Sequence, residues 1–146
     1  MAVGQLALIS AAFFAGAAFY VTMAEHPARM ALDDRALLQQ WKPSYKHGAA
    51  IQAPLALIGF VLGTIAWWQS GGWQWLAGAL ALVAAWPYTL LMIRPTNNEL
   101  LAIDLDKAGP HSRALLARWG RLHAGRTVLG AVATGLLVWA SLATPA

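Results

Sequence analysis

Three residues in the last third of the chain are spaced so that they could do acid–base chemistry together. Trp119, His123 and Arg126 follow the spacing i, i+4, i+7, which places their side chains on one face of a helix. An unperturbed histidine titrates at about pH 6.5, so it can take up and release protons near neutrality. An arginine remains charged and can hold an oxyanion. The pattern predicts a base and a cation side by side on an aromatic surface.

Four apolar stretches must position these residues. They cover residues 4–24, 47–68, 73–93 and 125–142, close to the roughly 20 residues that a helix needs to cross a bilayer. The hydrophobic fraction of 59% and the charged fraction of 11% differ strongly from soluble domains. We therefore expect one domain over residues 1–146, an all-α integral membrane bundle of four helices in up-down-up-down order. The last helix should extend back to about residue 112, and short interfacial helices should lie on the cytoplasmic side.

The charges are confined to two parts of the chain. All ten Lys and Arg and all six Asp and Glu fall within residues 25–47 and 94–126, as do the four histidines. Short loops rich in Lys and Arg stay in the cytoplasm, so both termini and the 69–72 turn should lie outside an inner or plasma membrane. Because every basic residue flanks a span, the positive charge does not indicate nucleic-acid binding. The absence of cysteine excludes disulfides and thiolate metal sites.

Several local signals predict where helices begin and end. Pro27 should end the first helix, because the residue before a proline disfavours helical geometry. Asp33 or Asp34 can cap a short helix that Pro43 then stops. Residues 96–99 have capping-box spacing, which predicts a short helix opening there along the inner surface.

The predicted topology brings polar residues from four helix ends to one membrane depth. These residues are Glu25, His26, His47, Asn97 or Asn98, His123 and Arg126. Deeper in the spans lie Gln52, Trp86 and Tyr88, and a polar side chain at that depth normally faces the bundle interior. Polar groups that converge beneath an apolar, aromatic bundle are typical of a site for an apolar small molecule that enters from the bilayer.

Four ordered motifs resemble the DUF1772 membrane family, which includes the anthrone oxygenases. They are GAAFY…EHP, WKPSYKHG…Q, WPYT…RPTNNEL and RWGRLHAGRT, spread over residues 10–140. The most specific are PTNNxL at 95–100 and WxxxHxxR at 119–126. The resemblance implies a small four-helix membrane fold. For the anthrone-oxidising members it also implies O2-dependent conversion of an anthrone to an anthraquinone without an organic cofactor.

A cofactor-free reaction of this kind needs a base, an oxyanion partner and a dry aromatic pocket. Removal of the proton from the central carbon makes an anthrone an electron-rich enolate, which can react directly with O2. We expect His47, His123 and Arg126 as catalytic residues, and Gln52, Trp86, Tyr88, Asn97 and Trp119 as substrate-binding residues.

Two other classes of protein stay open from the sequence. Copper or iron could be bound by Glu25, His26, His47 and His123, or two of the histidines could ligate a haem. The chain could instead be a non-enzymatic accessory subunit or lipid-binding protein within an oligomer or larger membrane assembly. The sequence alone does not decide between no cofactor, a transition metal and haem.

Overall fold

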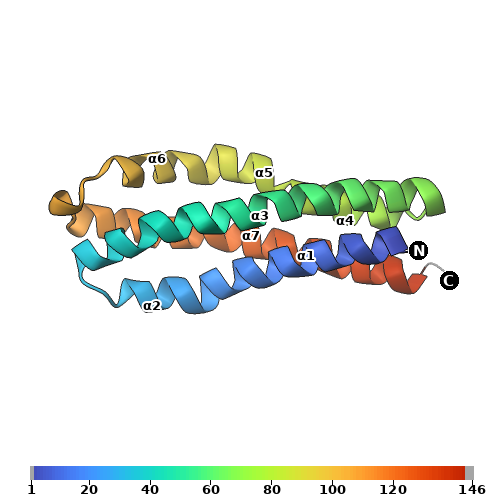
Figure 1. The fold of residues 1–146 in the computed structure, drawn as a ribbon, viewed down its shortest axis with the longest axis horizontal. Helices are drawn as coiled ribbons and strands as arrows, with labels where there is room; N and C mark the ends of the chain where they lie inside the picture. Colours follow the sequence, from blue (N-terminus) through green and yellow to red (C-terminus); the bar gives the residue numbers. More distant parts are fainter. Residues whose placement is uncertain (1, 144–146) are drawn as a thin grey trace.

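The computed structural model describes residues 2–143, and every helix and turn within that range confirms the predicted all-α bundle without a strand. Four helical rods run back and forth along one axis (Figure 1). The first comprises α1 (Ala2–Tyr20), the π-helical turn η1 (Val21–Glu25) and α2 (His26–Met30), and the second is α3 (Asp34–Ser70). The third comprises α4 (Trp73–Val83), α5 (Ala85–Tyr88), the π-helical turn η2 (Thr89–Ile93) and α6 (Arg94–Ala102). After the 3₁₀ turn η3 (Leu105–Lys107), the fourth is α7 (Pro110–Ala143).

The rods pack as a square. α1 and α4 each pack against both α3 and α7, whereas the diagonal pairs touch least. Each rod is long and apolar enough to cross a membrane, as predicted. The turn at Gly71–Gly72 lies at the same end as Ala2 and Ala143, which we call the hairpin end (Figure 1). The loops 31–33 and 103–109 lie at the opposite end, which we call the charged end.

The turn at the hairpin end is specified by one glycine. Gly71 has φ 69°, in the left-handed region, and its N–H donates to the Trp67 carbonyl at 2.7 Å. A side chain would be strained in this conformation, so glycine ends α3 and lets the chain reverse at once.

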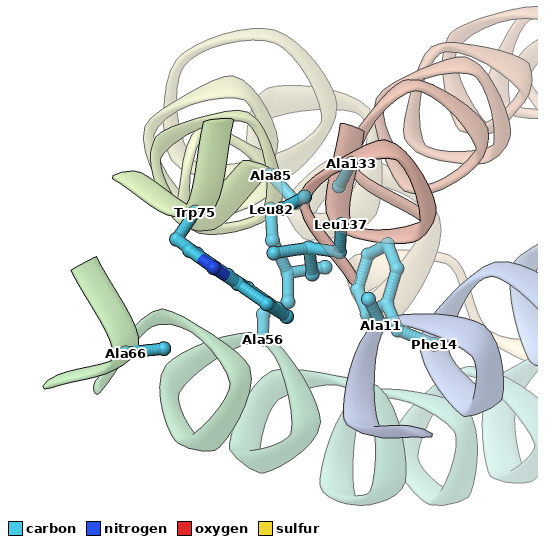
Figure 2. Packing of buried hydrophobic residues seen from close by; sticks show 10 residues of the cluster. Ala11, Phe14, Ala56, Ala66, Trp75, Leu82, Ala85, Ala133 and Leu137 are labelled. Carbon is cyan, nitrogen blue, oxygen red and sulfur yellow. The ribbon is translucent and has the colours of Figure 1, made fainter. Parts of the chain in front are cut away.

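The hairpin half of the bundle is closely packed around small residues. A Cβ atom at Gly63 would lie only 2.9 Å from the Cβ of Ala79, so the glycine allows α3 and α4 to touch. Figure 2 shows Trp75 reaching across from α4 toward α3, and the side chains of Trp75 and of Phe14 on α1 are both fully buried. Because lipid offers little hydrophobic driving force between helices, such close packing is what holds them together.

α3 is longer than the sequence suggested. It runs without interruption from Asp34 to Ser70, with Pro43 inside it. The predicted cap is confirmed, since Asp33 accepts from the Ala36 N–H at 2.9 Å. The predicted stop at Pro43 is wrong. An internal proline costs a helix about 3 kcal/mol or more, but the turns before it bury side chains, including Trp41, that hold them in place.

The first rod also passes its proline. It was expected to end near Pro27, but it continues to Met30. Just before the proline the helix widens, and the His26 N–H donates to the carbonyl of Val21, five residues back. The wider π turn gives the proline ring room against the preceding carbonyls. The expected end of the helix is therefore wrong.

The third rod also has a π turn directly before a proline. In η2 the Arg94 N–H donates to the Thr89 carbonyl, again five residues back, and Pro95 follows directly. α6 is thus a continuation of the span, and the prediction of a new helix opening at 96–99 is wrong. Wide turns of this kind are frequent at functional sites, and both of these lie beside the cavity described next.

Candidate active site

A cavity of about 200 Å³ lies between the charged end and the closely packed hairpin half. Its walls come from α3, the α5–η2 segment and α7, with single residues from η1 and α6. Small apolar side chains such as Ala49, Ala53 and Ala85 leave the space open. The polar and aromatic lining consists of Ser44, Tyr45, Trp86, Thr89, Asn97, Trp119, His123 and Arg126.

His123 is presented to the cavity by a stacked tryptophan and a threonine. Its side chain is only 6% exposed, and its ring stacks on Trp119 with centroids 4.8 Å apart. Nδ1 lies 3.2 Å from the hydroxyl of Thr22, which is 2.8 Å from that of Thr127. Within residues 2–143, no hydrogen bond engages Nε2. When Thr22 donates to Thr127, it accepts from Nδ1–H, and Nε2 keeps a lone pair that can take a proton.

Arg126 carries a positive charge into the cavity without an acidic partner. Its guanidinium donates to the Thr89 hydroxyl at 2.9 Å and to the Gln52 side-chain oxygen at 3.0 Å. It also lies 5.4 Å from the centre of the Phe14 ring. No Asp or Glu in the described part of the chain forms an ion pair with it. A desolvated charge held only by neutral groups attracts an anion.

Asn97 adds a neutral donor to the same wall. It is 1% exposed, and its side-chain oxygen accepts from the Trp119 indole N–H at 2.9 Å. That bond fixes which way the amide points, because an indole can only donate. The amide nitrogen donates to no group within the described residues, so it is available to a ligand.

The structure brings five of the eight predicted site residues into the cavity lining: Trp86, Asn97, Trp119, His123 and Arg126. The other three lie elsewhere. His47 is exposed on α3, with Nδ1 2.9 Å from the Pro43 carbonyl. The Tyr88 hydroxyl donates to the Leu122 carbonyl at 2.6 Å. Gln52 lies outside the lining, and its side-chain oxygen accepts from the Arg126 guanidinium at 3.0 Å.

A second buried arginine next to the cavity was not singled out from the sequence. Arg29 is 3% exposed and forms an ion pair with Glu25. It donates to the Ser44 hydroxyl at 2.8 Å, and Ser44 in turn donates to Glu25. The signal that could have revealed the pair is its i, i+4 spacing, typical of ion pairs on one helix face.

The four candidate metal ligands are not brought together. His26 packs against Trp119, with ring centroids 5.2 Å apart, in room left by Gly120. His47 lies outside the cavity. Among the residues that the structure describes, no three His, Asp or Glu side chains gather closely enough to hold a metal ion.

Comparison with known proteins places the chain in a family. The model of the anthrone oxygenase family matches residues 41–136. The chain belongs to the anthrone oxygenase family. It is 30% identical to an anthrone oxygenase of Claviceps purpurea, over 85% of this chain and 79% of the relative. It is 26% identical to the anthrone oxygenase tpcL of Aspergillus fumigatus, over 84% of this chain and 82% of the relative. No solved structure matches it.

The family match covers most of the cavity wall. Residues 41–136 include every lining residue except Val21. The chain is thus an anthrone-oxygenase-like oxidoreductase, and the matched range contains the parts of α3, α5, η2 and α7 that line the cavity.

Proposed function

We propose that this cavity oxidises a flat, apolar aromatic molecule of the anthrone or quinol type with O2. The observation that carries the proposal is Arg126, which has no acidic partner among the described residues and lines a largely apolar cavity beside His123. Such a site stabilises a substrate that becomes negatively charged during reaction more than one that remains neutral.

The first step is removal of a proton from the reactive carbon of the substrate. Nε2 of His123 accepts the proton, and the negative charge moves onto the substrate oxygen. Arg126 and the amide of Asn97 donate to that oxygen, while Trp86 and Trp119 pack against the rings. Charge that develops against fixed donors in a water-poor site is stabilised strongly.

The later steps need no outside electron donor. The enolate gives one electron to O2, and the two radicals combine into a peroxide, which takes the proton back from His123. Loss of the second proton from the same carbon, with cleavage of the O–O bond, leaves a ketone and releases water. In balance, one methylene group and one molecule of O2 become one carbonyl group and one molecule of water, so the substrate supplies every electron.

We further infer that the charged end faces the cytoplasm and that both termini lie outside. Arg94, Arg118 and Arg121 are exposed around this end, where they can contact the phosphates of membrane lipids. A reporter fused after residue 143 would test the orientation, because a cytoplasmic signal would contradict it.

The experiment that tests the reaction is turnover of anthrone by the purified protein in lipid nanodiscs. With ¹⁸O2, we expect anthraquinone to form faster than by spontaneous oxidation, with one labelled oxygen in each product and no added reductant. Arg126→Gln should abolish the enzymatic excess, and the matched surface variant Arg121→Gln should retain it. Turnover that equals the background, or that survives Arg126→Gln, would contradict the proposal.

A further inference from the structure

The cavity is closed on three sides. Toward the charged end it is covered by a buried apolar cluster that includes Trp41 and Trp119. Toward the hairpin end it meets the packed core that includes Phe14 and Leu82. His123 and its neighbours on α7 form the third side. In each of these three directions a ligand would have to displace buried groups.

The fourth side lies between α3 and the α5–η2 segment. Trp86 and Leu90 are 41% and 49% exposed, whereas the rest of the lining is buried or half-buried. On α3 the nearest lining residues are Ala49 and Ala53, and Ser44 and Tyr45 line the cavity from one or more turns nearer the charged end. The Trp86 indole N–H donates to the Ala53 carbonyl at 3.1 Å. One indole ring thus bridges the opening between two helices.

The depth of this opening decides which solvent it faces. Ala53 follows Lys46 by seven residues and Trp86 precedes Arg94 by eight, so both lie about 10–12 Å inward of the charged residues at 1.5 Å per residue. The neighbouring outward-facing side chains, such as Leu57, are apolar. At that depth the opening faces the hydrocarbon core of the bilayer.

We propose that this opening is a lateral portal through which an apolar aromatic substrate enters from the bilayer, with Trp86 as its gate. The proposal rests on the proposed function for the class of ligand. A single neutral hydrogen bond is a weak restraint, so the indole can leave the Ala53 carbonyl and return. The small residues on α3 then give a flat ring system room to pass.

The test uses a probe that can reach the cavity by only one route. A phospholipid whose acyl chain ends in anthraquinone keeps its headgroup at the membrane surface, so its ring enters only through an opening in the hydrocarbon region. Binding is followed in vesicles by quenching of tryptophan fluorescence. We expect this lipid to bind and to compete with free anthraquinone.

Two matched variants test the position of the portal. Ala53→Phe places a ring in the opening, whereas Ala50→Phe places the same ring on an exposed neighbouring position outside the lining. We expect Ala53→Phe to slow association of free anthraquinone about tenfold, and Ala50→Phe to leave it unchanged. Trp86→Phe keeps an aromatic ring without the N–H, so association and dissociation should both become faster.

Failure of the portal and failure of the function give different results. If free anthraquinone binds but the anthraquinone lipid does not, the portal is overturned and the cavity remains the binding site. Equal association rates in the wild type and a folded Ala53→Phe variant would also overturn it. If free anthraquinone does not bind at all, the proposed function is overturned and the portal with it.

Discussion

In the hairpin half of the bundle the helices are in contact throughout, whereas in the charged half they separate around a cavity. Gly63 and Gly78 are two of the positions at which helices touch closely in the first half. The second half contains the π turns η1 and η2 and the buried aromatic side chains Trp41 and Trp119 beside the cavity. The difference indicates that packing along the same four rods stabilises the protein at one end and leaves room for chemistry at the other.

The two buried arginines of the charged half extend this comparison. Arg29 has a carboxylate partner in Glu25 and stays outside the cavity lining. Among residues 2–143, Arg126 has only neutral partners, and it lines the cavity. A cation that is already neutralised contributes to structure, whereas one that is left uncompensated can bind a charge that appears during reaction.

The largest effect should come from the base. His123→Ala should lower kcat/KM for anthrone by about 10²–10⁴-fold, the usual contribution of a positioned general base. The unfolding temperature should change little, since the hairpin half is untouched. His47→Ala is the matched control and should behave as the wild type, because His47 is exposed outside the cavity. Equal losses from both would mean that the cavity is not the site.

Arg126→Gln should have the second largest effect. It should lower kcat about 10²–10³-fold, as expected when one donor to a developing oxyanion is lost. Removing a buried charge without a counter-charge should leave the unfolding temperature equal or higher. Arg29→Gln should lower the unfolding temperature, because it leaves the Glu25 carboxylate without its ion-pair partner. Thermal unfolding and initial rates, measured on the same samples, check both.

A substitution in the hairpin half should change stability instead of activity. Gly63→Val should lower the free energy of unfolding by about 1–3 kcal/mol through overpacking, because a Cβ there would lie 2.9 Å from Ala79. The folded fraction should keep its kcat. Gly135→Val is the control, since a Cβ at Gly135 meets nothing within 4 Å. A loss of kcat in folded Gly63→Val would contradict the claim that the hairpin half contributes to stability and not to activity.

The smallest effect should come from the threonine that orients His123. Thr22→Val keeps the shape but cannot accept from Nδ1–H, so kcat should fall about tenfold, as for loss of a group that positions a catalytic one. Thr22→Ser should restore most of the rate. If Thr22→Ser is as slow as Thr22→Val, the hydroxyl is not what matters.

Much of the fold could be predicted because it follows from composition and spacing. The four apolar stretches, the cap at Asp33 and the shared face of Trp119, His123 and Arg126 depend only on local sequence. What was missed depends on packing between distant segments. Pro27 and Pro43 are strong local stop signals, yet tertiary contacts and a π turn carry the helices through them.

The site residues divide in the same way. His47 was expected in the site because of its position along a span, but the rotation of α3 about its axis places that side chain outside the cavity. Thr22 and Thr89 could not be foreseen at all. Each lies in a π turn, and an added residue in a turn shifts which side chains face inward.

The most direct test of the account is a structure of the protein in lipid with anthraquinone bound. The account predicts the ring system in the charged half, between Trp86 and Trp119, with one ketone oxygen about 2.7–3.2 Å from an Arg126 guanidinium nitrogen. His123 should lie beside the central ring. Anthraquinone bound in the hairpin half, on the lipid-facing surface, or in the cavity but away from Arg126 would contradict it.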